Sequence, residues 1–485
     1  MYQVIPAKPQ APSSIDERRW EHSALRRRLL TGLWEQDLEE ELLRHLPTDR
    51  REALGPSDMS SCAIEQVTRQ LAMLYHAEPQ VTAEGDISSL VGREGFVSKA
   101  GYFQLMQKVQ QMTLGIREMF VRVDVSPHYE GDRARVPGLS FRCVSPDFVI
   151  ATASEDAPDI PLYYQELRLR LDPQSGEPIW VWDILDIRDK NNPMFGMYRA
   201  TPSGEIGEEM SEIYMGHPTM RGDDYPYRSQ DGSPFLPVVL YHAERTGQLF
   251  NAFDAAQLAY GSLTAAVLFS FYVHCVRDNS WPQKYVAGLS LQGLSQLEGD
   301  LLGRRSAIST DPSSILMFQS DPDMQGQPLI GSFQYADPEK LLDSISKYEY
   351  RVATAAGISS EVLRQSGDPR SGYALSISRE GQREAQRKYA PIFRRSDEEM
   401  MTKCAMLCNR FLGTSLPESG YRVVYAPLGL SPEEMKAQRE DIIQKLSAGL
   451  ISPVDAMQML NPDLDAAEAK RELDRIRQER ATYNL

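Results

Sequence analysis

The spacing of hydrophobic residues divides the chain into helical and extended segments. Over residues 16–78 apolar side chains recur every three or four positions, which is the period of an amphipathic helix. One stripe contains Trp20, Leu25, Leu29, Leu30, Leu33 and Trp34, and another contains Ile64, Val67, Leu71 and Leu74. A further helix is predicted over residues 98–114. The N-terminal part of the chain is therefore predicted to be helical.

The period then changes to that of β-strands. Alternating or β-branched and aromatic residues fill residues 120–125, 139–154, 162–171, 179–187 and 235–244. The turn DPQSGEP separates the third and fourth segments, so residues 162–187 are predicted to form a hairpin. We expect Trp180 and Trp182 to lie in the core of this hairpin.

A long apolar helix is predicted over residues 247–278. Its central part, NAFDAAQLAYGSLTAAVLFSFYVHCV, contains one carboxylate and is long enough to span a membrane. Five polar residues and the lack of a basic flank on its N-terminal side argue against a span: Gln257, Ser262, Thr264, Ser270 and His274. An apolar helix outside lipid must be buried on most faces, and neighbouring subunits would provide that cover.

The rest of the chain alternates between loops and helices. Short strands and polar turns are predicted over residues 280–335. Asp337 and Pro338 are a typical helix start, and the helix is expected to end at Gly357. A glycine-rich loop and a helix over residues 373–412 follow. Three C-terminal helices are predicted from the capping pattern at Ser431, the Gly449–Pro453 break and the charged segment 463–482.

Composition limits the classes of function. The chain has 485 residues, 41% apolar and 25% charged, as in a folded protein of several domains or one large body. Five cysteines, an odd number, favour a reducing compartment, and prolines near the N-terminus argue against a signal peptide. The net charge of −16 argues against tight, sequence-reading DNA binding and leaves weak contact with DNA open.

Catalytic motifs are missing from the sequence. There is no phosphate-binding loop, H-E-x-x-H motif, G-x-S-x-G elbow or G-x-G-x-x-G turn. Cys404 and Cys408 lie one helical turn apart without further ligands nearby, so we expect a buried pair and no metal. We therefore predict no catalytic residues and no cofactor. An enzyme that processes nucleic acid, or a hydrolase whose site is assembled from scattered residues, stays as the alternative.

The order of elements resembles that of the portal proteins of tailed bacteriophages. The resemblance rests on four stretches in the right order: residues 60–82, 232–270, 350–393 and 428–476. It covers most of residues 55–480 and implies an α+β fold, predominantly helical, with a β-rich wing and a small α/β clip. The implied regions are a wing (1–246), a stem helix (247–278), a clip (279–336), a second stem helix (337–357), a tunnel loop (358–373), a long helix with its connection (374–429) and a helical crown (430–485).

The resemblance also implies a function. Portal proteins form a ring of about twelve copies at one capsid vertex, through which double-stranded DNA is packaged and ejected. The implied partners are the terminase large subunit, the major capsid and scaffolding proteins, and head-tail adaptor proteins, without a membrane. The protein would be located in the virion, and in the host cytoplasm during assembly. An acidic channel surface would let DNA slide without holding its phosphates.

The tunnel loop supplies most candidate site residues. Its glycines and Pro369 permit unusual backbone angles, and its arginines would touch phosphates transiently while Asp368 limits their hold. Pairing of these arginines with a neighbouring subunit's carboxylates is an equal alternative. The candidate residues of the loop are Arg364, Gln365, Ser366, Asp368, Arg370 and Tyr373.

Four further basic residues are candidates for the channel or the clip. Lys284, Arg304 and Arg305 would face DNA or the packaging motor, although each also suits an ordinary solvated surface. Lys347 would add positive charge to the channel, and an ion pair with Asp343 on the same helix is the competing interpretation.

Overall fold

The computed structural model of the chain describes most of its residues. Helices account for 49% and strands for 20%, and the described strands pair antiparallel except for one parallel pair, which agrees with the α+β class. The described residues are 6–11, 13–48, 51, 54, 57–60, 62–130, 134–172, 175–210, 225–280, 282, 284–287, 315–318, 329–332, 337–355, 372–428, 432–460 and 466–483.

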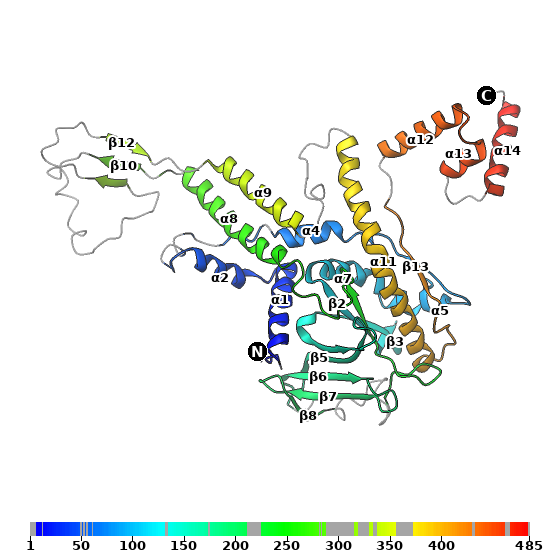
Figure 1. Cartoon of the computed structure of the whole chain (residues 1–485), viewed down its shortest axis with the longest axis horizontal. Coiled ribbons are helices and arrows are strands. Elements are labelled where there is room, and N and C mark those ends of the chain that lie inside the picture. The colour runs from blue at the N-terminus through cyan, green and yellow to red at the C-terminus, as the bar shows by residue number, and fades with distance from the viewer. Residues whose placement is uncertain are drawn as a thin grey trace.

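Two antiparallel sheets form the β-rich part of the body (Figure 1). The first has the order β3-β2-β9, with strands β2 (Glu118–Glu130), β3 (Ala134–Val144) and β9 (Val238–His242). The second is a meander of β4 (Val149–Ala153), β5 (Pro161–Leu171), β6 (Pro178–Asp186), β7 (Met194–Ala200) and β8 (Ile206–Glu209). A short helical turn, η1 (Pro146–Phe148), joins the two sheets in the chain. The predicted hairpin is confirmed, since β5 pairs with β6 from Tyr163–Asp186 to Leu171–Pro178.

Helices from the N-terminal part cover the first sheet and the start of the long apolar helix. They are α1 (Ser14–Thr31), α2 (Glu35–His45), α4 (Ala63–Leu71), α5 (Ser88–Val91), α6 (Phe96–Lys99) and α7 (Tyr102–Ile116). The start of α1 is capped by Ser13, whose Oγ accepts a hydrogen bond from the Asp16 N–H at 3.1 Å. The helix ends at Gly32, whose φ of 76° is left-handed. Leu33 therefore lies outside the helix and is 68% exposed, so its predicted place in the buried stripe is wrong.

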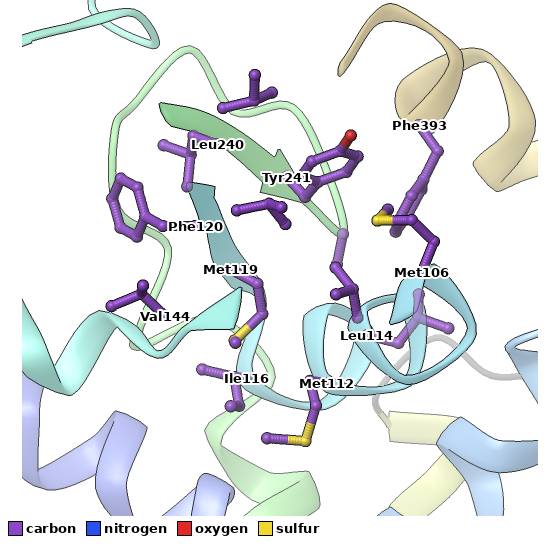
Figure 2. Packing of buried hydrophobic residues seen from close by; sticks show 14 of the residues in the cluster. Met106, Met112, Leu114, Ile116, Met119, Phe120, Val144, Leu240, Tyr241 and Phe393 are labelled. Atoms are coloured by element: carbon purple, nitrogen blue, oxygen red, sulfur yellow. The ribbon is translucent and has the colours of Figure 1, made fainter. Parts of the chain in front are cut away.

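The main core lies between α7, the first sheet and α11 (Gly372–Phe411) (Figure 2). Strand β2 is the central strand of its sheet, and both of its faces are buried between Met119 and Val123. Figure 2 shows Tyr241 of β9 directed toward Phe393 of α11, and their ring centroids are 5.7 Å apart. A two-stranded sheet of β1 (Gln80–Thr82) and β13 (Arg422–Val424) lies next to α11.

Helices α8 (Ala256–Ser280) and α9 (Pro338–Ala355) form an antiparallel arm that extends from the body (Figure 1). At its far end lies a sheet of β10 (Lys284–Ala287), β11 (Ile315–Phe318) and β12 (Leu329–Ser332), in the order β11-β10-β12. The start of α9 is as predicted, because Asp337 Oδ1 accepts from the Glu339 N–H at 3.0 Å. The predicted start of α8 at residue 247 is wrong, because Gly247 and Ala255 have positive φ.

The C-terminal part contains a long helix and a small helical unit. Helix α11 has 40 residues and includes Pro391. The unit contains α12 (Pro432–Ser447), α13 (Pro453–Leu460) and α14 (Ala466–Tyr483). The predicted break between α12 and α13 is present: Gly449 has φ of 72°, and Ser452 and Asp455 cap α13 reciprocally at 3.0 and 3.1 Å. The predicted cap at Ser431 lies outside the described residues.

Candidate functional site

The arm extends from the body, and its inner half is tightly packed. At Gly261 of α8 a Cβ atom would lie 2.6 Å from Val352 Cγ2 of α9, so the two helices approach closely there. On α9 the side chains that face inward are spaced three or four residues apart, with Ile345, Val352 and Ala353 buried. The inner half of the arm is therefore a close-packed helix pair.

Two serines of α8 tie the arm to the N-terminal part of the chain. Ser262 Oγ accepts a hydrogen bond from the Ile64 N–H at 2.9 Å, and Ser270 Oγ accepts from the Asp58 N–H at 3.2 Å. Each serine also donates to the carbonyl one turn earlier in α8. These polar residues of the apolar helix thus bind protein backbone over its inner half.

The outer half of the arm is less covered than the inner half. No residue of α8 from Phe271 to Ser280 is fully buried, and Val273 is 46% exposed. On the outer half of α9, Leu342 is also exposed. Within the described residues α8 is the one helix long and apolar enough to cross a membrane, and less than half of its most apolar segment is buried. The outer half of α8 is therefore only partly covered within the described residues, and Val273 is its exposed apolar side chain, beside the exposed Arg277 and Ser280.

Two arginines fix the base of the arm to the body. Arg26 of α1 is buried and donates to the carbonyl oxygens of Ile116, at 3.0 Å, and of Asp254. Burial lowers the pKa of Arg26 to about 10. Arg117 forms ion pairs with Asp254 at 2.9 Å and with Glu244 at 3.2 Å. The segment that leads into α8 is held by these contacts.

The predicted site residues are only partly within the described structure. Lys347 is exposed on α9, and its Nζ lies 2.5 Å from Asp343 Oδ2, so the competing ion pair is present. Lys284 is the first residue of β10, and Tyr373 lies in the first turn of α11. The structure describes the backbone of these two residues but not their side chains. The other predicted residues, Arg304, Arg305, Arg364, Gln365, Ser366, Asp368 and Arg370, lie outside the described residues.

A buried carboxylate that the sequence analysis missed anchors α11 to the body. Asp397 is fully buried and accepts hydrogen bonds from four tyrosine hydroxyls: Tyr75 and Tyr425 on Oδ2 at 2.8 and 2.6 Å, and Tyr102 and Tyr241 on Oδ1 at 2.8 Å each. Burial raises the pKa of Asp397, and the tyrosine hydrogen bonds act in the opposite direction. We refer to these five residues as the tyrosine cluster.

An ionic network joins the two sheets of the body. Arg122 of β2 lies 3.2 Å from Glu166 Oε2 of β5 and 3.3 Å from Asp183 Oδ2 of β6, and all three are buried. Arg142 and Arg168 add contacts of 2.8 Å to Glu166 and Asp183, respectively. Burial alone would raise the pKa of Asp183, but the surrounding arginines lower it to about 2. These carboxylates are closed off from solvent, so the network is suited to holding the sheets together.

Two cysteines of α11 are similarly inaccessible. Cys404 and Cys408 are buried on α11, as predicted, and burial raises the pKa of Cys408 to about 12. Among the described residues no group of three or more His, Cys, Asp or Glu side chains is arranged to hold a metal ion. No protein-family model matches the sequence, and the search of curated proteins gives no match either.

Proposed function

We propose that the chain is a non-enzymatic subunit of the ring-shaped portal of a tailed bacteriophage, through which double-stranded DNA enters and leaves the capsid. The arm is the observation that carries the proposal. It has two antiparallel helices with a small sheet at their far end, and the outer half of α8 is only partly covered, with Val273 exposed. This arrangement agrees with the stem and clip that the order of elements in the sequence implies.

A ring of identical subunits would cover the exposed half of the arm. In a closed ring each subunit presents one surface to its neighbour on one side and a different surface to the other. The exposed side of α8, including Val273, would then pack against the arm of the next subunit, with no lipid required. Each Å² of apolar surface buried in this contact would contribute about 25 cal/mol to the free energy of assembly.

The remaining parts of the proposal concern DNA and partner proteins. The net charge of −16 per chain gives the ring an acidic character, which suits a channel through which DNA slides. The sheet at the end of the arm would bind the terminase large subunit and later the head-tail adaptor proteins. A separate terminase would hydrolyse ATP for packaging.

Electron microscopy and native mass spectrometry of the purified protein test this function. Rings with a central hole and about twelve subunits are expected. The variant Val273→Glu places a charge on the exposed outer half of α8 and should prevent ring formation without unfolding the subunit. Leu171→Glu, on an exposed position of β5 away from the arm, is the matched control and should leave the rings intact. A monomer or dimer at micromolar concentration, or normal rings from Val273→Glu, would contradict the proposal.

A further inference from the structure

We propose that a small cleft in the body, independent of the arm and of the proposed function, binds an oxyanion group such as phosphate or carboxylate. The cleft lies where the end of β9, the middle of α11 and the loop before β5 meet. The polar side chains that line it are Asp159, His242, Arg245, Arg395, Ser396 and Glu399.

The hydrogen bonds of His242 determine which of its ring nitrogens carries the proton. Thr246 Oγ1 donates to Asn251 Oδ1, which orients the amide so that Asn251 Nδ2 faces the imidazole. Asn251 Nδ2 then lies 3.3 Å from His242 Nδ1, which accepts this hydrogen bond. Burial lowers the pKa of His242 to about 4, so the ring is neutral near pH 7. A neutral imidazole that accepts at Nδ1 carries its proton on Nε2.

The Nε2–H group of His242 has no acceptor among the described residues. His242 is only 6% exposed, and its Nε2 is buried without a hydrogen-bond partner in the described part of the chain. A buried N–H group without an acceptor is rare in folded proteins, because desolvation is not compensated. His242 lines the cleft, so a small movement of its ring would bring this N–H group to an oxygen atom of a bound group.

The charges around the cleft favour an anion. Arg245 pairs with Asp159, and Glu399 pairs with Lys403 at 2.6 Å. Arg395 makes no ion pair with any residue that the structure describes, so one guanidinium group stays uncompensated.

The two arginines of the cleft also act on each other. Burial and the nearby positive charge of Arg395 lower the pKa of Arg245, and the carboxylate of Glu399 acts in the opposite direction. An anion between the two guanidinium groups would relieve this repulsion and accept charge-assisted hydrogen bonds.

The cleft has room for a small oxyanion. Its volume of about 30 Å³ is enough for the oxygens of a phosphate or carboxylate. Both arginines are exposed, so the bound group has a path from solvent. Because the lining residues come from three separate segments, a bound oxyanion would fasten α11 to both sheets.

Phosphorus NMR of inorganic phosphate, titrated with the intact protein, tests the site. The phosphate line should broaden with wild-type protein, and Arg395→Gln should weaken binding at least about tenfold. Arg394→Gln is the matched control, because Arg394 is the adjacent exposed arginine on α11 and does not line the cleft. Acetate added as a competitor distinguishes the source: displacement of phosphate assigns the site to oxyanions in general, and no displacement assigns it to phosphate groups.

Two results would overturn the site. Equal broadening by wild-type protein and Arg395→Gln would place the phosphate elsewhere. An equal loss of phosphate binding in Arg394→Gln would mean that the basic surface attracts phosphate non-specifically. As a second measurement, nitrogen NMR of protein labelled on histidine should give a protonated Nε2 for His242. A protonated Nδ1 would remove the donor on which the site depends.

Discussion

The hydroxyl oxygens of Tyr102 and Tyr241 lie 2.7 Å apart, and each also lies 2.8 Å from the same oxygen of Asp397. With the contacts of Tyr75 and Tyr425, the tyrosine cluster contains five short oxygen–oxygen contacts. Four hydroxyl protons fill only four of them, because each hydroxyl has one proton to donate. With a proton on Oδ1, Asp397 would donate to one of these two tyrosines, and that tyrosine would donate its own proton to the other, so all five contacts would be filled. This agrees with the raised pKa of the buried carboxyl.

The first prediction concerns the pH dependence of stability. Because the pKa of Asp397 is raised in the folded state, its contribution to stability is largest below the ordinary value of 3.8 and is lost as the pH rises through the folded-state pKa. The free energy of unfolding of the wild type, relative to Asp397→Asn, should therefore decrease as the pH rises above about 4. Urea denaturation at a series of pH values measures this difference.

The control for this experiment is Asp441→Asn. Asp441 is an exposed aspartate on α12 that pairs with Lys445 at 2.7 Å, so its replacement should have little effect at any of these pH values. A constant difference between the wild type and Asp397→Asn over the whole range would show that Asp397 does not titrate there.

The second prediction concerns the ionic network, whose contribution to stability should change with pH in the opposite direction to that of Asp397. The arginines around Asp183 lower its pKa to about 2, so its contribution is present above the unfolded value of 3.8 and is lost as the pH falls toward 2. Asp183→Asn should cost about 3–5 kcal/mol near neutral pH, because Arg122 loses a buried partner. The difference from the wild type should shrink in acid.

Asp186→Asn is the matched control for Asp183→Asn on the same strand. Asp186 pairs with Arg188, whose side chain is 57% exposed, and a pair of this kind contributes about 0–1 kcal/mol. Denaturant unfolding of both variants from neutral to acidic pH compares them. Equal costs for the two variants would mean that burial of the network adds nothing to stability.

The third prediction concerns the close approach of α8 and α9. Glycine to alanine in a helix normally stabilises it by up to about 1 kcal/mol. At Gly261 the new methyl group would overlap Val352, so Gly261→Ala should instead cost about 1–3 kcal/mol, confined to the arm. Hydrogen exchange of α8 and α9 would measure the loss of protection. Adding Val352→Ala should restore part of it, and purely additive costs would exclude a direct contact.

The fourth prediction concerns the tunnel loop and rests on the proposed function. Deletion of residues 366–372 should leave ring assembly intact and impair DNA packaging or retention. A variant with a glycine–serine loop of the same length separates the role of the side chains from that of chain length. The DNA content of assembled particles is the measurement. Normal DNA-filled particles from the deletion would refute a role for the loop.

Local signals predicted much of the fold. The β5–β6 hairpin follows from the turn DPQSGEP, and the start of α9 follows from Asp337 and Pro338, because both depend on neighbouring residues. The start of α8 could not be predicted in this way. The Asn251 N–H donates to Glu118 Oε2 at 2.9 Å, so a contact over 133 residues replaces the hydrogen bond of a continuous helix.

The functional groups were harder to predict from the sequence. Asp397 lies at helical spacing between Phe393 and Cys404, both buried, and a single carboxylate on an apolar face is a signal that could have identified it. Its four tyrosines could not be identified, because they come from distant segments and meet only in the folded chain. The acceptor-free Nε2 of His242 likewise depends on Asn251 and Thr246, whose roles are set by the loop between β9 and α8.

The tyrosine cluster also has a consequence for synthesis of the protein on the ribosome. Tyr75 lies 322 residues before Asp397, and Tyr425 lies 28 residues after it. The hydroxyls of Tyr75, Tyr102 and Tyr241 therefore leave the ribosome long before the carboxylate that they bind. The core of the body therefore cannot form completely until α11 and β13 have been synthesised. A chain whose synthesis stops within the arm would expose core residues to chaperones and proteases.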